Sequence, residues 1–176
     1  MAATTNRIAE RAGYSIGTLY QYFPNKVALL GALAERHLDD AATRLHRTFA
    51  DLDDSRPNWE DTVRALAATL AALHADRPRL HTVLYDLAPR LPEGVARLHA
   101  LHAEVTAALA RHVRRCGVAP AGDGGDGAGE QEQADRTAAL LVQTAEVTLH
   151  RIVLADTASG TDVDALATPL AETLLA

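Results

Sequence analysis

The stretch that decides the fold lies near the N-terminus, where residues 5–23 read TNRIAERAGYSIGTLYQYF. Ala9 supplies the small residue that two closely crossing helices need on the inner face of the first helix. Gly13 supplies a turn residue that tolerates a positive φ. The apolar residues expected to lock the two helices together are Ile8, Tyr14 and Leu19. This spacing predicts a helix-turn-helix, although the pattern taken alone has many chance matches.

Capping residues mark the ends of these helices. Thr4 and Thr5 are N-cap candidates for the first helix, and Ser15 is the candidate for the second, which we expect to run through Tyr22. A Pro-Asn pair then interrupts the chain, and Asn25 can cap a long third helix. The stripe along one side of that helix consists of Leu30, Leu33, His37, Ala41, Leu45, Phe49 and Leu52.

The rest of the chain has helical periodicity as well. After a polar turn at 51–57, we expect helices from about 58, from 78 to 89, from 92 to 116, from 134 to 155 and from 162 to 175. Residues 118–133 are rich in Gly, Asp and Glu and are expected to form a flexible loop. No segment has a convincing strand pattern. The sequence therefore predicts an all-α protein with a small domain at 1–45 and a larger helical domain at 46–176.

The composition agrees with a helical protein. Hydrophobic residues make up 48% of the 176 residues, but only 4% are aromatic, and Ala and Leu carry most of the apolar content. These two residue types lose little free energy on entering a helix. The single cysteine cannot form an internal disulfide, and no signal peptide or membrane-spanning apolar run is recognisable. We expect a cytoplasmic protein with no membrane partner.

The formal net charge of −6 argues against a protein that coats nucleic acid without specificity. A DNA contact would need a local basic patch. Residues 1–30 supply one, because three basic residues stand there against Glu10 alone. The three are Arg7, Arg11 and Lys26, and Lys26 is the only lysine in the chain.

A longer string makes the interpretation more specific. Residues 8–30 read IAERAGYSIGTLYQYFPNKVALL, which closely resembles the signature of the TetR (tetracycline-repressor-like) family of transcriptional regulators. The resemblance is strong over about residues 4–34 and, beyond them, consistent in helix layout. It implies that Thr5 holds one DNA phosphate and Lys26 clamps another. It also implies a recognition helix in the major groove, with DNA-contacting residues Ser15, Ile16, Gly17, Thr18, Tyr20, Gln21 and Tyr22.

Elementary chemistry agrees with these roles. Gly17 and Thr18 are small enough to let a helix approach the floor of a groove. Tyr20, like Thr18, can donate a hydrogen bond to a phosphate, and Gln21 can read a base edge. Lys26 adds a cation where the N-terminus of a helix already favours an anion. The competing interpretation is that these residues only decorate the surface of a helical hairpin.

The start of the chain departs from the family pattern. Family members carry another helix of a few turns before the motif, and here only Met1, Ala2 and Ala3 precede Thr4. That helix completes the core of the small domain and contributes a phosphate contact. We therefore expect a truncated or misassigned start, with weaker DNA binding by this exact chain than by an N-terminally extended form.

By the same resemblance, the larger domain binds a small-molecule effector and dimerises through its last two long helices. The helix expected at 134–155 has a second apolar face formed by Leu140, Thr144, Val147 and Leu154. A helix that is apolar on two faces has two partners, its own domain and a second subunit, unless both faces fill the core of one protomer. A homodimer also suits DNA half-sites spaced about one helical turn apart. The predicted interface residues are Leu141, Ala145, Leu149, Ile152, Leu166 and Leu170.

The sequence does not identify the effector. Polar or aromatic residues on otherwise apolar helices can orient a ligand in a pocket, and the competing interpretation of each is an ordinary surface or core residue. The candidates are Trp59, Tyr85, His102, Glu146 and His150. His99 and His102 have the spacing of a helical metal pair, but no carboxylate or cysteine cluster accompanies them. We predict no metal and no cofactor other than the unidentified effector.

No pattern of catalysis is present: the sequence has no Gly-rich phosphate loop, no nucleophile elbow and no HExxH motif. We therefore predict that the protein is not an enzyme. The favoured function is that of a ligand-responsive repressor that binds a palindromic operator as a dimer, and an activator is a further possibility. The competing hypothesis is a DNA-incompetent helical module that binds a small molecule or a protein partner, and it is supported only by the missing first helix.

Overall fold

The computed structural model describes residues 4–76, 80, 83, 92–118, 127–155 and 162–176, without the side chains of 152–155. Its helices are α1 (Thr5–Arg11), α2 (Ile16–Tyr22), α3 (Lys26–Ser55), α4 (Trp59–Asp76), α6 (Pro92–Cys116), α7 (Gly127–Ala155) and α8 (Val163–Leu175). These ranges contain no strand, so the prediction of an all-α fold is confirmed. The helix expected at 78–89 falls outside the described residues apart from two positions.

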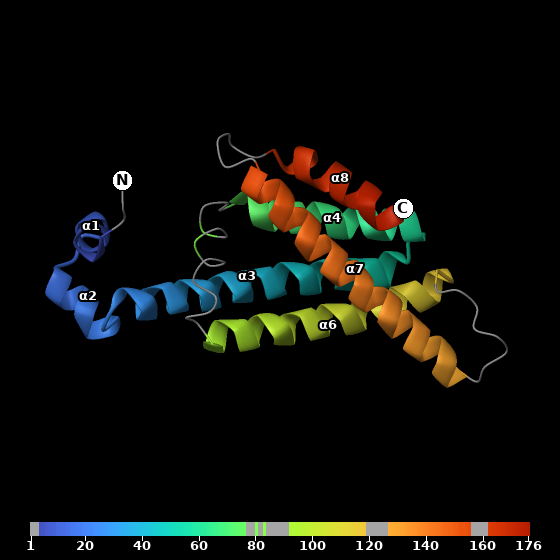
Figure 1. Cartoon of the computed structure of the whole chain (residues 1–176), viewed down its shortest axis with the longest axis horizontal. Coiled ribbons are helices and arrows are strands. Elements are labelled where there is room, and N and C mark those ends of the chain that lie inside the picture. Colours follow the sequence, from blue (N-terminus) through green and yellow to red (C-terminus); the bar gives the residue numbers. More distant parts are fainter. Residues whose placement is uncertain (1–3, 77–79, 81–82, 84–91, 119–126, 156–161) are drawn as a thin grey trace.

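Two short helices lie apart from the others (Figure 1). Helices α1 and α2 lie at one end of the long helix α3, beyond the rest of the bundle. Helix α6 lies alongside α3, α8 packs mainly on α4, and α7 packs against both α6 and α8. The N-terminal pair is therefore carried at the tip of a helix whose other half belongs to the bundle.

The first three helices begin at side-chain caps. Thr4, Ser15 and Asn25 each accept the backbone N–H of the residue three positions further on, at 2.9–3.4 Å. Gly13 has a φ of +74°, and Gly117, which follows α6, has a φ of +65°. Both lie in the left-handed region that glycine adopts most readily. The predicted turn at Gly13 and the predicted end of α6 are confirmed.

Helix α3 joins the two predicted domains without a break. Because it runs from Lys26 to Ser55, the predicted boundary between residues 45 and 46 falls inside the helix. Near its end, Phe49 and Leu52 pack into a core that also contains buried residues of α4, α6 and α7. The division into two domains stays a prediction, and α3 is the element that would connect them.

Helix α7 begins earlier than predicted. It starts at Gly127, so the loop expected at 118–133 is wrong for the first seven residues of this helix. Few of these side chains are buried, which is why the composition indicated a loop. The ion pair between Glu132 and Arg136, one turn apart, and the full burial of Ala134 favour the helix instead.

The apolar side of α7 packs inside the protomer. Ala145 and Leu149 share a core with Val63 of α4 and Leu170 of α8. Leu166 of α8 is buried in a neighbouring cluster against α4. These side chains are covered by their own chain.

Of the predicted interface residues, Ala145, Leu149, Leu166 and Leu170 are thus buried within the protomer, and the dimer interface stays a prediction. Leu141 is half-buried and packs against the core between α3 and α6, and the side chain of Ile152 lies outside the description. The sequence pattern located the apolar faces of α7. It did not determine which face the protomer itself would cover.

A buried histidine connects the C-terminal ends of α3 and α6. His112 is 1% exposed and stacks on Phe49, with the ring centroids 5.8 Å apart. The Arg115 guanidinium donates to His112 Nδ1 at 3.2 Å and to the Pro57 carbonyl oxygen at 2.6 Å. His112 Nε2 lies 3.3 Å from a carboxylate oxygen of Asp53. Burial lowers the pKa of His112, and the nearby Asp53 offsets only part of this effect.

We expect the stability of the fold to decrease on acidification. Burial lowers the pKa of His112 and of His74 in α4, whereas a histidine in the unfolded chain binds a proton near its ordinary pKa of about 6.5. Below that pH the unfolded state takes up more protons than the folded state, and the free energy of unfolding falls. The melting temperature should change little above about pH 7.5 and decrease between about pH 7 and 5.5.

The variant His112→Gln checks the origin of this slope. Because glutamine does not titrate, the variant should lose part of the decrease in melting temperature that the wild-type chain shows on acidification. A melting temperature of the wild-type chain that rises between about pH 7 and 5.5 would contradict the expected sign.

Candidate nucleic-acid interface and effector cavity

The side chains in the first turn of α2 are mostly small, and this turn is accessible to another molecule. Ser15 Oγ caps the helix and also lies 2.9 Å from Thr18 Oγ1. A Cβ atom placed on Gly17 would meet only the Ser15 hydroxyl, at 3.7 Å. The first turn of the helix therefore presents backbone and short polar side chains, and another molecule can approach it closely.

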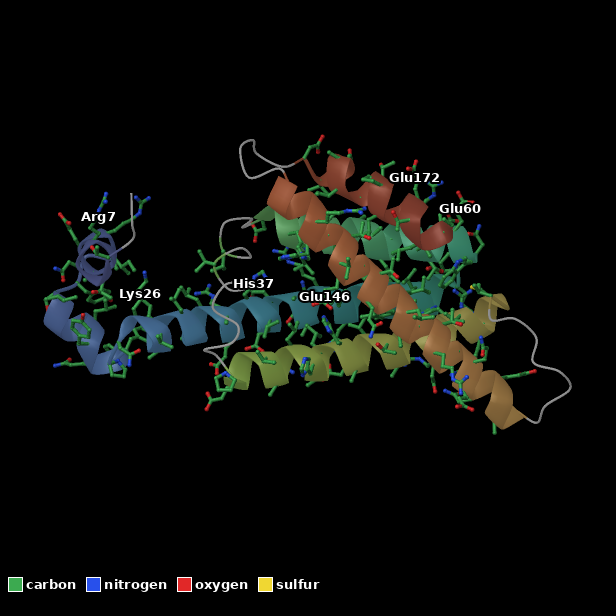
Figure 2. All side chains as sticks on the ribbon, viewed as in Figure 1. Arg7, Lys26, His37, Glu60, Glu146 and Glu172 are labelled. Carbon is green, nitrogen blue, oxygen red and sulfur yellow. The ribbon has the colours of Figure 1, made fainter. Side chains whose placement is uncertain are left out.

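Two hydroxyl groups meet where α1 faces α2. Thr5 Oγ1 lies 3.2 Å from the Tyr20 hydroxyl oxygen. Figure 2 shows Arg7 on α1 and Lys26 at the start of α3 at this same end of the molecule. The exposed Lys26 follows the Asn25 cap, so its charge adds to the partial positive charge of the N-terminus of α3. Two hydroxyls and nearby cations are suited to binding phosphate oxygens.

The remaining side chains predicted to contact DNA are accessible. Tyr22 is 76% exposed, and Ile16, Tyr20 and Gln21 are also exposed on α2. Only Thr18 and Thr5 of the predicted set are half-buried. Helix α2 has no buried residue, so most of its surface is open to a partner.

Tyr14 does not lock the two helices, contrary to the prediction. Its side chain is 64% exposed, while its backbone N–H donates to the Ala9 carbonyl oxygen at 3.0 Å. The left-handed Gly13 immediately precedes it and redirects the chain. The apolar residues with the least exposure in this helix pair are instead Ile8, Ala9 and Leu19.

A large cavity of about 820 Å³ lies among α3, α4, α6 and α7. One wall is formed by α3 between Ala34 and Leu45, and most of the lining is leucine, valine and alanine. Its size falls within the range of small-molecule sites, which are mostly apolar with a few polar groups that orient the ligand. The cavity thus shares a helix with the N-terminal helix pair.

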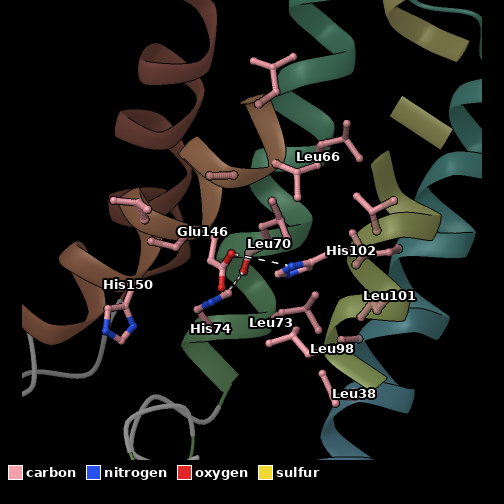
Figure 3. Close-up of a pocket in the computed structure, with 18 of the residues that line it drawn as sticks. Leu38, Leu66, Leu70, Leu73, His74, Leu98, Leu101, His102, Glu146 and His150 are labelled. Carbon is pink, nitrogen blue, oxygen red and sulfur yellow. Dashed lines mark hydrogen bonds and ion pairs between the residues drawn. The ribbon is translucent and has the colours of Figure 1, made fainter. Parts of the chain in front are cut away.

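Ionisable side chains from several helices meet in this cavity (Figure 3). Glu146 of α7 lies between His74 of α4 and His102 of α6, and His150 lies nearby on α7. A carboxylate oxygen of Glu146 is 3.8 Å from His102 Nδ1, an ion pair when the imidazole is protonated. His37 of α3 also lines the cavity.

Four of the five predicted ligand-binding residues line the cavity: Trp59, His102, Glu146 and His150. Tyr85, the fifth, lies outside the described residues. Sequence reasoning missed His37 and His74. The signal for His37 was its position within the apolar stripe of α3, which was interpreted only as helical periodicity. The helical pattern of α4 gave no reason to select His74.

His74 is held as a neutral group. Its Nδ1 lies 2.8 Å from the Leu70 carbonyl oxygen, to which a protonated Nδ1 donates. Burial lowers the pKa of His74, the Leu70 carbonyl offsets part of this, and His37 and His150 lower it further. The carboxylate of Glu146 is thus surrounded by imidazoles of which His74 is kept uncharged.

The second apolar face of α7 is open to solvent. Leu140 is 64% exposed and Val147 is 67% exposed, and they lie two turns apart on the same side as the exposed Thr144. The side chain of Leu154 lies outside the description. Exposed large apolar residues on one helix face are typical of a surface that contacts another protein.

No group of three or more His, Cys, Asp or Glu side chains among the described residues is arranged to hold a metal ion, and His99 is exposed. None of the described helices combines the length and hydropathy needed to cross a membrane.

Helices α1 and α2 have the arrangement of a helix-turn-helix, and they lie at the tip of a long helix whose other half walls an apolar cavity. Residues 1–33 match the family model of bacterial regulatory proteins of the tetR family. Over these residues the chain is similar to that family.

Known proteins with similar sequences are regulators of transcription. The chain is 37% identical over 98 residues to the tetracycline repressor protein class C of Escherichia coli, covering 56% of this chain and 43% of that protein. It is 34% identical over 64 residues to the HTH-type transcriptional activator FasR of Mycolicibacterium smegmatis, covering 36% of this chain and 29% of that one. The matches thus span less than half the length of either relative.

A solved structure shares the fold over nearly the whole chain. It is a protein from Mesorhizobium loti MAFF303099 assigned to the TetR family of transcriptional regulators, with a TM-score of 0.67 and 17% identity. The match covers 98% of this chain and 85% of that one.

Proposed function

We propose that this protein is a DNA-binding transcriptional regulator, a repressor that binds a palindromic operator as a homodimer and responds to a small-molecule effector. The observation that carries the proposal is that one helix, α3, bears the helix-turn-helix at its start and forms a wall of the cavity from Ala34 onward. Of the two sequence relatives described above, the one with the longer match is a repressor, and this favours repression over activation.

In the DNA complex, α2 enters the major groove. The absence of a side chain at Gly17 allows close approach, and Gln21 reads a base edge. The Thr5 and Tyr20 hydroxyls, 3.2 Å apart, bind one phosphate together, and Lys26 binds another with the N-terminus of α3. These contacts fix the register of the helix on the duplex.

The effector acts by shifting a population. It must bind more tightly to the arrangement of subunits that cannot reach two half-sites at once than to the arrangement that can. A molecule in the cavity touches α3 directly, so a small change in the direction of this helix is carried to its far end. The exposed face of α7, with Leu140 and Val147, forms part of the dimer contact.

Selection of genomic fragments by the immobilised chain, followed by gel-shift titration of the best fragment, tests the proposal. Gln21→Ala should weaken binding by about 1–3 kcal/mol and relax the preference at one base position. Lys26→Ala should weaken binding to all fragments alike and lower the salt dependence of log K by about one unit.

The control is Arg47→Ala, which removes an exposed cation further along α3 and should leave the affinity unchanged. Enrichment of no fragment above random DNA would contradict DNA-specific regulation and would favour a helical module that binds only a small molecule or a protein. Equal effects of Arg47→Ala and Lys26→Ala would contradict the proposed reading head.

A further inference from the structure

The polar groups of the cavity are few and chemically restricted. Apart from the indole of Trp59, the lining residues that carry polar side chains are the imidazoles of His37, His74, His102 and His150, the carboxylate of Glu146 and the guanidinium of Arg151. No hydroxyl or amide side chain lines the cavity within the described residues. Among the described lining residues, the carboxylate and the guanidinium are therefore contributed by Glu146 and Arg151.

These two charged residues do not point the same way. They are five positions apart on α7, which at about 100° per residue separates their directions by about 140°. Val147, one turn before Arg151, is 67% exposed, so Arg151 lies toward solvent at the rim of the cavity. His150, one turn after Glu146, shares the face of the carboxylate.

The Glu146 side chain is 51% exposed, and it lies at the histidine-lined end of the cavity. Figure 3 shows its carboxylate directed between His74 and His102. At a pH near 8 imidazoles are uncharged unless their pKa is raised, and the pKa of His74 is lowered by its burial. The carboxylate of Glu146 therefore places a negative charge at this end of the cavity, beside an imidazole whose pKa is lowered.

We propose that the effector is an apolar molecule that carries a single protonated amine, and that Glu146 receives its ammonium group while the aliphatic walls cover the rest. This inference rests on the proposed function, since it names the chemical class of the effector. A carboxylic acid would place a second anion beside Glu146. An uncharged molecule would gain no ion pair with it.

Three probes of equal chain length test the charge selection: decylamine, decan-1-ol and decanoate, each used below the concentration at which it forms micelles. Isothermal titration calorimetry measures the Kd of each probe directly. At about pH 8 we expect the Kd of decylamine to be about tenfold lower than that of decan-1-ol, with decanoate the weakest.

The variant Glu146→Gln should abolish the preference for decylamine over decan-1-ol and leave the Kd of decan-1-ol nearly unchanged. Glu130→Gln makes the same substitution at an exposed position in the first turn of α7 and should preserve the preference. Thermal melting of each variant checks folding, and the comparison of the three probes on the wild-type chain decides the question even where a variant does not fold.

The outcomes separate this inference from the proposed function. Equal Kd values for decylamine and decan-1-ol would overturn the amine class while leaving a ligand-binding cavity. Tightest binding of decanoate would overturn it in favour of an anion held by imidazoles and Arg151. The absence of binding by every probe would overturn both the amine class and the cavity as an effector site.

Discussion

Leu149→Ala should lower the free energy of unfolding by about 2–5 kcal/mol, whereas Leu140→Ala, on the same helix, should change it by less than about 0.5 kcal/mol. Leu149 is 1% exposed and packs with Val63 of α4 and Leu170 of α8. Removing its side chain leaves a cavity where three helices meet. Leu140 is 64% exposed, and its truncation removes few contacts within the protomer.

Urea unfolding followed by far-ultraviolet circular dichroism measures both changes. The experiment should be run at protein concentrations low enough for self-association to contribute nothing, because a bound partner adds to the apparent stability. If Leu140→Ala lowered the free energy of unfolding as much as Leu149→Ala, the assignment of the buried and exposed faces of α7 would be wrong.

The double variant Leu140→Asp and Val147→Asp should convert the proposed dimer into a monomer, with the dimer Kd raised by about 100-fold or more. Both side chains are large, apolar and exposed on one face of α7. Burying an unpaired carboxylate costs several kcal/mol, and a two-fold symmetric contact would contain each substitution twice. The affinity for the operator should decrease as well, because a monomer reaches only one half-site.

Sedimentation equilibrium measures the association, and gel shift on the same samples measures the operator affinity. Ala96→Asp is the control, because it adds a carboxylate to an exposed position of α6 and should leave the dimer intact. A wild-type chain that stays monomeric at all accessible concentrations would refute the dimer. A double variant that stays dimeric would show that the dimer contact lies on another surface.

The distinction between the two faces of α7 also shows where sequence reasoning fails. The helical repeat of apolar residues identified both faces, because periodicity depends only on the 3.6-residue turn. The face that includes Leu149 and Ala145, which was predicted as the dimer contact, is covered by α4 and α8 within the protomer. Periodicity contains no information about which neighbour covers a face.

The cavity presents a similar case. Trp59, His102, Glu146 and His150 were selected as polar residues on apolar helices, and they line one cavity. His74 lines the same cavity but was not selected. Its place near Glu146 follows from the packing of α4 beside α7, which no local pattern encodes.

By itself, the sequence determined the features that depend on neighbours in the chain. The caps at Ser15 and Asn25, the left-handed turn at Gly13 and the end of α6 near Gly117 each need only a few consecutive residues. Only the tertiary structure decided which apolar face is buried, which imidazoles surround Glu146, and that α3 both carries the helix-turn-helix and lines the cavity. These arrangements arise from packing between residues distant in the chain, and a periodic pattern along one helix does not specify its partners.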